Sequence, residues 1–202
     1  MTNQPEPVRP GRKRSEESRL AILRAAFEIV AEQGYGALSV ERIASRSGVG
    51  KQTIYRWWPT KADVLLEALA LKADLHIPVP AEDSYTADLR AFLAATFALA
   101  RNKQVVAVLR ALMAEAQIDD GFGERFRDSF LRGRREALRQ LLDRAAARGD
   151  LPVTITPELV IDLVFGALWY RLLAAHRSLD DQLADDLVAI LTASGDLIAR
   201  SN

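Results

Sequence analysis

The stretch GVGKQTIYRWWPTK, from Gly48 to Lys61, places cations, an amide and bulky aromatic rings close together. On a helix, where successive residues are about 100° apart, Ile54 and Trp58 share one side while Gln52 and Arg56 lie opposite. Amide and guanidinium groups donate hydrogen bonds to phosphate oxygens and to the edges of nucleic-acid bases. The stretch therefore predicts a helix with one side in a core and the other against an anionic surface.

Two short helices and a tight turn are expected to position that polar side. Ser39 is a good N-cap for a helix over about 40–46, because its hydroxyl accepts a hydrogen bond from the first turn. Gly48 supplies a left-handed residue between this helix and the next. The second helix spans about 50–57 and ends before Pro59, because the residue preceding a proline avoids helical dihedral angles. Such a pair of helices is a helix-turn-helix.

The rest of the chain also has helical apolar spacing, and no segment shows the alternation of a strand. Thr60 and Asp63 form a variant of the capping box, and Thr156-Pro157 is a typical helix start. Besides the two helices above, helices are predicted over about 15–33, from Thr60, and over 85–100, 103–117, 122–148, 157–175 and 180–199, with a linker near 76–84. The expected fold is all-α, with about nine helices.

Charge divides the chain although its formal net charge is zero. Residues 1–61 hold eleven basic and six acidic residues, a net charge of +5, so the remainder carries −5. A basic first third is typical of a segment that meets an anionic partner. We expect a flexible basic arm at 1–14, a helix-turn-helix domain at 15–60 and a larger helical domain at 61–202. The arm is either a DNA contact or a solubilising tail.

The composition argues against catalysis and metal binding. There is no cysteine, the two histidines are His76 and His176, and neither a glycine-rich phosphate loop nor an HExxH motif occurs. We therefore expect no enzyme activity, no metal and no cofactor. No run of 18 apolar residues occurs, and the basic N-terminus has no apolar stretch behind it. The expectation is a cytoplasmic protein with no membrane partner.

The segment LSVERIASRSGVGKQTIYRWWPTKADVLLEAL, with the helix before it, resembles the DNA-binding domain of the TetR/AcrR family of transcriptional regulators. The match covers residues 17–70 and includes the family signature IA…GV…T(I/L)Y…K…L. The resemblance implies three N-terminal helices for DNA and a larger helical domain for ligand binding and dimerisation. It also implies a ligand-responsive repressor that binds a near-palindromic operator as a homodimer and is released by a small-molecule effector. Activation instead of repression stays open.

The resemblance also implies which side chains meet DNA. Lys51, Gln52 and Thr53 would approach bases or nearby phosphates, while Tyr55 and Lys61 would contact phosphates. Trp58 would take the family's buried phenylalanine position, and Trp57 would either stack on the sugar-phosphate backbone or pack. The full set of expected DNA-binding residues is Ser39, Lys51, Gln52, Thr53, Tyr55, Arg56, Trp57 and Lys61.

For the larger domain, large side chains with apolar bodies are candidates for an effector pocket. These are Phe97, Met113, Phe126, Phe130, Phe165, Trp169 and Tyr170. Helical spacing in the last two helices suggests a dimer face, with an intramolecular core as the alternative. Its candidates are Leu159, Leu163, Ala167, Leu183, Leu187, Ile190 and Leu191. Two other functions compete. One is a helical enzyme or small-molecule binding protein without DNA function, for which no catalytic constellation is present. The other is an interaction module, which would have lost the cations of the 51–61 segment.

Overall fold

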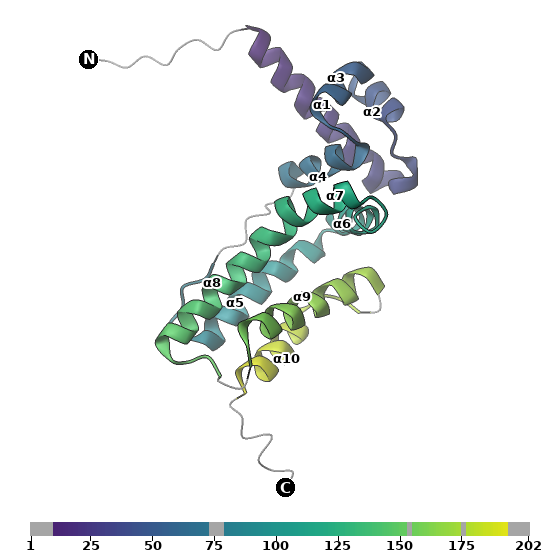
Figure 1. The fold of residues 1–202 in the computed structure, drawn as a ribbon. Coiled ribbons are helices and arrows are strands. Elements are labelled where there is room, and N and C mark those ends of the chain that lie inside the picture. Colours follow the sequence, from purple (N-terminus) through teal and green to yellow (C-terminus); the bar gives the residue numbers. More distant parts are fainter. Residues whose placement is uncertain (1–9, 73–78, 153–154, 175–176, 194–202) are drawn as a thin grey trace, which may run out of the picture. The chain divides into compact units, whose positions relative to one another are not determined.

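The computed structural model describes residues 10–72, 79–152, 155–174 and 177–193, with side chains from Ser15 onward. Residues 1–9 of the expected arm, both histidines and the predicted helix end at 194–199 lie outside these ranges. The chain divides into two compact units, residues 1–74 with 107–115, and residues 75–106 with 116–202. The described residues contain helices and no strand, which confirms the all-α fold (Figure 1).

The first unit contains the predicted helix-turn-helix. It comprises α1 (Pro10–Gln33), the short η1 turn (Tyr35–Ala37), α2 (Val40–Ser47), α3 (Lys51–Trp57), α4 (Lys61–Lys72) and residues 107–115 of α6 (Lys103–Glu115). The α1 helix packs against both α2 and α4. It begins five residues earlier than expected, because Pro10 fits the first helical position, where no N–H donor is needed. The α4 helix groups with this unit, although the sequence-based boundary at 60/61 assigned it to the second domain.

Local signals define the ends of these helices. The Ser39 hydroxyl accepts a hydrogen bond from the Arg42 amide at 3.2 Å. Gly48 has φ 70° and ends α2 in the left-handed conformation. At the start of α4, the Asp63 carboxylate accepts from the Thr60 amide at 3.1 Å, and the Thr60 hydroxyl accepts from the Asp63 amide at 3.2 Å. The predicted caps and the predicted glycine turn are confirmed.

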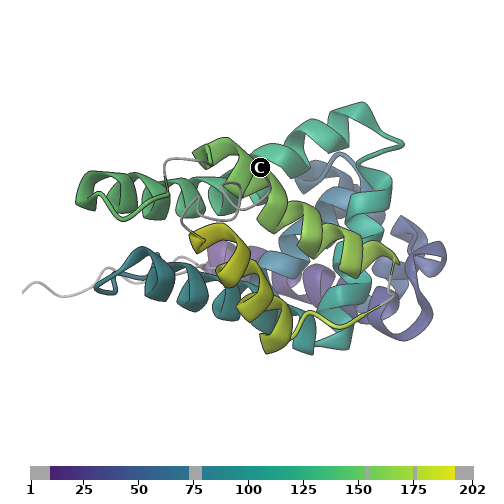
Figure 2. The same cartoon turned by 90° about the horizontal axis from the view of Figure 1, so that it is seen from below.

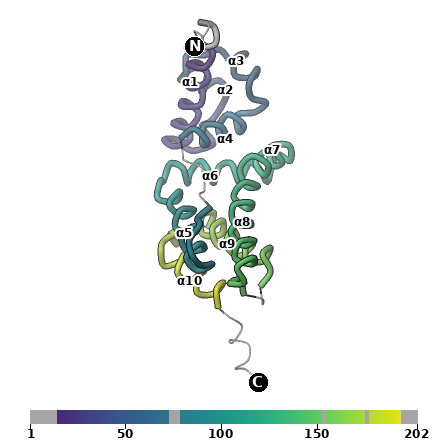
Figure 3. Tube along the Cα trace, turned by 90° about the vertical axis from the view of Figure 1, so that its left-hand side faces the viewer, coloured from purple at the N-terminus to yellow at the C-terminus, as the bar shows by residue number. Residues whose placement is uncertain are grey.

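The second unit is a helical bundle. Its helices are α5 (Tyr85–Ala98), η2 (Leu99–Arg101), the start of α6 (Lys103–Glu115), α7 (Asp120–Phe126), η3 (Arg127–Leu131), α8 (Arg132–Arg148), α9 (Pro157–Ala174) and α10 (Asp181–Thr192). Residues of α5, α8, α9 and α10 share one apolar core. The α5 helix packs against α8 and α10, as Figures 2 and 3 show, and α8 packs against α9. One π-helical turn, η3, interrupts the helix predicted over 122–148.

A buried carboxylate ties the chain before α5 to the end of α8. Asp88 is fully buried and accepts hydrogen bonds from the Glu82 amide at 2.8 Å and from the Arg148 guanidinium at 2.9 Å. Asp150 accepts from the Tyr85 amide at 2.7 Å. Burial, and to a lesser degree the charge of Asp150, raises the pKa of Tyr85 to about 12. These contacts fix the N-terminal end of α5.

None of the described helices is by itself long and apolar enough to cross a membrane. The segments Tyr85–Arg101 and Lys103–Glu115 reach that length and composition only as a pair, and they are bent by 95° at their junction.

Candidate nucleic-acid interface

The α3 helix has one buried and one exposed side, as its sequence predicts. Ile54 lies in the core, and the following Trp58 keeps only 4% of its surface exposed. Gln52 and Arg56 lie opposite this buried side, and Lys51 and Tyr55 lie at its edges. All four side chains are exposed, and together we call them the polar face of α3. Tyr55 is 57% exposed, so its phenol is accessible to a partner.

The end of α3 is anchored by Glu67, a carboxylate that was not predicted from the sequence. The indole N–H of Trp58 donates to Glu67 Oε2 on α4 at 2.6 Å. The other oxygen of Glu67 accepts a hydrogen bond from Arg19 on α1. Glu67 therefore joins α1, the end of α3 and α4. A buried tryptophan usually needs a hydrogen-bond acceptor for its indole N–H. The predicted burial of Trp58 was therefore the one sign in the sequence that such an acceptor would be present.

Trp57 packs within the same unit. It is half-buried, and its ring lies edge-on to that of Trp58 with centroids 5.4 Å apart. The Arg56 guanidinium lies 5.4 Å from the centroid of the Trp57 ring, within cation–π range. Of the two roles expected for Trp57, packing is therefore present, and stacking on DNA stays a prediction.

Two of the expected DNA-binding cations have partners inside the first unit. Lys51 Nζ lies 2.9 Å from Glu41 Oε1 on α2. This hydrogen bond raises the pKa of Lys51 and lowers the pKa of Glu41. Lys61 Nζ donates to the Leu38 carbonyl at 3.1 Å and lies 4.6 Å from the centroid of the Tyr35 ring. Lys61 thus joins the start of α4 to the chain before α2.

All eight expected DNA-binding residues belong to the first unit. Six of them lie on α3, Ser39 caps α2, and Lys61 begins α4. Among the cations of α2, Arg46 pairs with Glu28 and Glu32 of α1. The arrangement offers an amide, a phenol, an ammonium and a guanidinium to solvent from one short helix. Such a set can donate to phosphates and base edges.

The expected effector-pocket residues are distributed unevenly. Phe97, Phe126, Phe130 and Phe165 are buried. Trp169 is half-buried, whereas Tyr170 is exposed. Met113 is half-buried too, but it lies in the segment 107–115, which groups with the first unit. The Phe126 and Phe130 rings stack with centroids 5.3 Å apart.

A charged side chain lies beside this aromatic stack. The buried Arg134 places its guanidinium 3.8 Å from the centroid of the Phe130 ring. Burial lowers the pKa of Arg134 to about 10. The interior of the second unit is thus not purely apolar.

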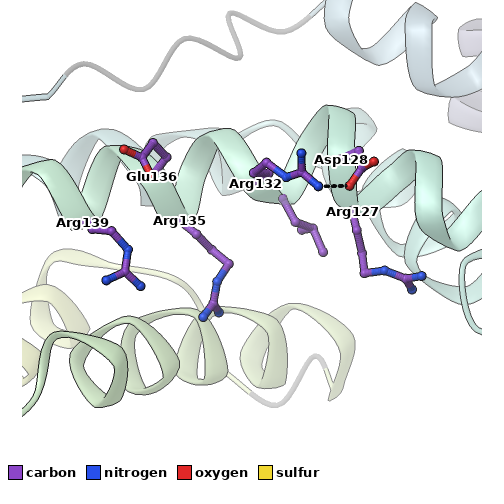
Figure 4. Close-up of a pocket in the computed structure, with 7 residues that line it drawn as sticks. Arg127, Asp128, Arg132, Arg135, Glu136 and Arg139 are labelled. Atoms are coloured by element: carbon purple, nitrogen blue, oxygen red, sulfur yellow. Dashed lines mark hydrogen bonds and ion pairs between the residues drawn. The ribbon is translucent and has the colours of Figure 1, made fainter.

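A groove along α8 has a different character from the expected pocket. Its volume is about 610 Å³, and it is lined by Arg127, Asp128, Leu131, Arg132, Arg135, Glu136 and Arg139. Arg135 and Arg139 extend toward α9, as Figure 4 shows, and pair there with Asp162 at 3.1 Å and Glu158 at 2.8 Å. None of the expected aromatic residues lines this groove, so the aromatic effector pocket stays a prediction.

The expected dimer-face residues fall into two groups. Leu183, Leu187 and Leu191 are buried in the core of the second unit. Leu159, Leu163 and Ile190 are exposed, and Ala167 is half-buried. Tyr170 and Leu173 extend the exposed apolar side of α9, and Leu173 was not among the residues predicted for this face. An exposed apolar helix side of this length is typical of an interface.

Two family models match the chain. The model described as "Bacterial regulatory proteins, tetR family" matches residues 22–68, and "Tetracyclin repressor-like, C-terminal domain" matches residues 79–191. The uncharacterized HTH-type transcriptional regulator YdeS of Bacillus subtilis is 34% identical over 180 residues, which cover 88% of this chain and 89% of YdeS. The DNA-binding transcriptional repressor TetR of Mycobacteroides abscessus is 27% identical, over 90% of this chain and 97% of that protein.

Solved structures agree with these matches. The TetR family transcription regulator SCO0332 is 30% identical, with a TM-score of 0.66 over 87% of this chain and 97% of its own. FadR from Bacillus subtilis, solved in complex with stearoyl-CoA, has a TM-score of 0.68 over 86% and 97% of the two chains. At 20% identity, the likeness to FadR concerns the fold alone.

Proposed function

Because this chain belongs to the TetR family of transcriptional regulators, we propose that it represses transcription by binding a near-palindromic operator as a homodimer, until a small-molecule effector releases it. Its relatives are regulators, and the chain is not an enzyme. Because the proposed role is to bind DNA, we also propose a cytoplasmic location.

The observation that supports this function most strongly is the polar face of α3. Its side chains have no role in the core, whereas the buried Ile54 and Trp58 fix the helix from behind. In the proposed complex, α3 enters the major groove, and Lys51, Gln52 and Thr53 approach base edges. Ser39, Tyr55, Arg56, Trp57 and Lys61 would contact the phosphate backbone around this groove.

The proposed dimer uses the exposed apolar side of α9. Leu159, Leu163, Tyr170 and Leu173 recur at spacings of three, four and seven residues, so they share one side of the helix. Ile190 adds an exposed apolar residue on α10. A homodimer would cover these side chains and bring two α3 helices to successive major grooves, about 34 Å apart.

We propose a small apolar or amphipathic effector. This rests on the buried aromatic side chains Phe97, Phe126, Phe130 and Phe165, of which Phe97 and Phe165 lie in the core of the second unit. An effector that prefers one conformation of the dimer shifts the population toward it, and this can misalign the two α3 helices relative to the grooves. Stearoyl-CoA is the ligand of FadR in its solved complex, and the likeness in fold does not extend that chemistry to this chain.

The proposal is tested by a gel shift on the DNA upstream of the protein's own gene, with an excess of competitor DNA. Wild type should give a discrete complex that Tyr55→Ala and Gln52→Ala weaken, because both side chains are exposed and neither supports the core. Gln140→Ala, an exposed amide on α8, is the matched control and should bind as wild type. A complex equally strong in all four proteins would exclude the polar face of α3 as the DNA contact.

A further inference from the structure

One carboxylate lies at the polar face of α3. Glu41, on α2, pairs with Lys51, the first residue of α3, across the turn between the two helices. Both side chains are exposed, Glu41 to 61% and Lys51 to 54%. In the part of the chain that the structure describes, no other carboxylate pairs with a cation of α3.

Other ion pairs of the first unit join its helices to one another without involving α3. Arg46 joins α2 to α1 through Glu28 and Glu32, and Arg19 joins α1 to α4 through Glu67. Neither arginine belongs to α3, so the carboxylates of these ion pairs do not contact a cation of the proposed DNA-binding helix. Glu41 lies in the first turn of α2, where its charge complements the helix dipole, and it is also the carboxylate that reaches the proposed DNA contact.

A carboxylate at this place has two effects on a bound duplex. It occupies the ammonium of Lys51, which would otherwise neutralise a phosphate. It also repels phosphates within about 10 Å, the screening length at 0.1 M salt. Both effects weaken binding to any DNA, because phosphate contacts supply sequence-independent affinity. Neither effect prevents Lys51 from donating to the O6 and N7 atoms of a guanine.

We infer that Glu41 is a specificity-determining residue, which holds Lys51 away from phosphates and directs it to base edges. This inference rests on the proposed DNA-binding function. Glu41 lowers the affinity for random DNA more than the affinity for the operator, so it raises the ratio between the two. The mutual hydrogen bond shifts both pKa values toward the charged forms, so the pair is ionised at neutral pH.

The variant Glu41→Gln keeps the size of the side chain and removes its charge. Lys51 is then released to contact a phosphate, which makes the slope of log K against log salt steeper by about 0.9. Binding to a scrambled duplex is expected to tighten roughly three- to tenfold at low salt, with a smaller change for the operator. The specificity ratio falls accordingly.

The matched control is Glu28→Gln. It changes the net charge of the same unit by the same amount, and Arg46 keeps Glu32 as its partner. Full-length proteins are compared by fluorescence anisotropy on two duplexes of equal length and composition. One is the sequence selected from a random pool by the wild type, and the other is its scrambled version. Salt is varied between about 50 and 200 mM.

The inference is supported if Glu41→Gln alone gives the steeper slope on the scrambled duplex, and if the change disappears in a Lys51→Gln background. It is overturned if Glu41→Gln and Glu28→Gln behave alike, or if the effect persists without Lys51. A wild-type protein that does not distinguish the two duplexes would instead refute the proposed function, and this inference with it.

Discussion

The Glu67 carboxylate is expected to stabilise the first unit mainly through Trp58. Replacing it by alanine leaves the Trp58 indole N–H without its acceptor, and Trp58 is only 4% exposed. An unsatisfied buried donor costs about 1–3 kcal/mol. The ion pair with Arg19 adds less than about 1 kcal/mol, because its side chains are 36% and 34% exposed and screened by solvent. Glu67→Ala should therefore lower the free energy of unfolding by about 1–4 kcal/mol.

This loss is measured by urea unfolding followed by tryptophan fluorescence. A Trp169→Phe background removes the tryptophan of the second unit, so Trp57 and Trp58 report on the first. Glu67→Gln retains an acceptor oxygen and should cost less than about 1 kcal/mol. Glu16→Ala, which removes the other partner of Arg19, should cost less than about 0.5 kcal/mol. The reasoning fails if Glu67→Ala and Glu67→Gln are equally destabilising, or if Trp58→Phe leaves the cost of Glu67→Ala unchanged.

Three further perturbations test the structure at other places. Gly48→Ala should destabilise by about 1–2 kcal/mol in thermal unfolding, because φ is 70° and open space around the added methyl leaves the backbone as the sole cost; an unchanged melting temperature would contradict the left-handed turn. Asp88→Ala should cost about 2–4 kcal/mol in urea unfolding, since it removes a fully buried acceptor, whereas the exposed Asp186→Ala should be nearly neutral. The pKa of Tyr85 is raised to about 12, so the unfolded chain loses this proton at lower pH than the folded chain, and the contribution to stability is lost as pH rises from about 10 to 12. Tyr85→Phe should abolish this alkaline loss in unfolding curves at pH 9 to 12, and an identical pH profile would contradict the shifted pKa.

Local signals in the sequence were sufficient to predict the helix-turn-helix. The burial of Ile54 and Trp58 followed from helical spacing, and the turn at Gly48 followed from the need for a left-handed residue. The capping box at Thr60 was equally local. These features depend on residues within a few positions of one another, so a single segment contains the information.

The contacts between helices were not predictable in this way. Glu67 contacts Trp58 and Arg19 only because α1, α3 and α4 pack together. The spacing of residues along one helix does not predict such contacts between helices. The same holds for Glu41 and Lys51. The π-helical turn at η3 had no local indication either, since Arg127–Leu131 continues the helical apolar spacing around it.

Helical spacing also left the covering partner of an apolar side undetermined. Leu183, Leu187 and Leu191 share one side of α10, and the structure covers them with the core of the same chain. Leu159 and Leu163 show similar spacing on α9 and remain exposed. Periodicity identifies a side that must be covered, but an intramolecular core and a second chain satisfy it equally well.

The central claim is that the polar face of α3 binds operator DNA. Its most direct test is hydroxyl-radical footprinting of the operator with wild type and with the triple variant Lys51→Ala, Gln52→Ala, Tyr55→Ala, whose substitutions are all at exposed positions. The wild type should protect two patches about 10 base pairs, or a multiple of this, apart, and the triple variant should protect neither. A footprint that the triple variant leaves unchanged would contradict the central claim.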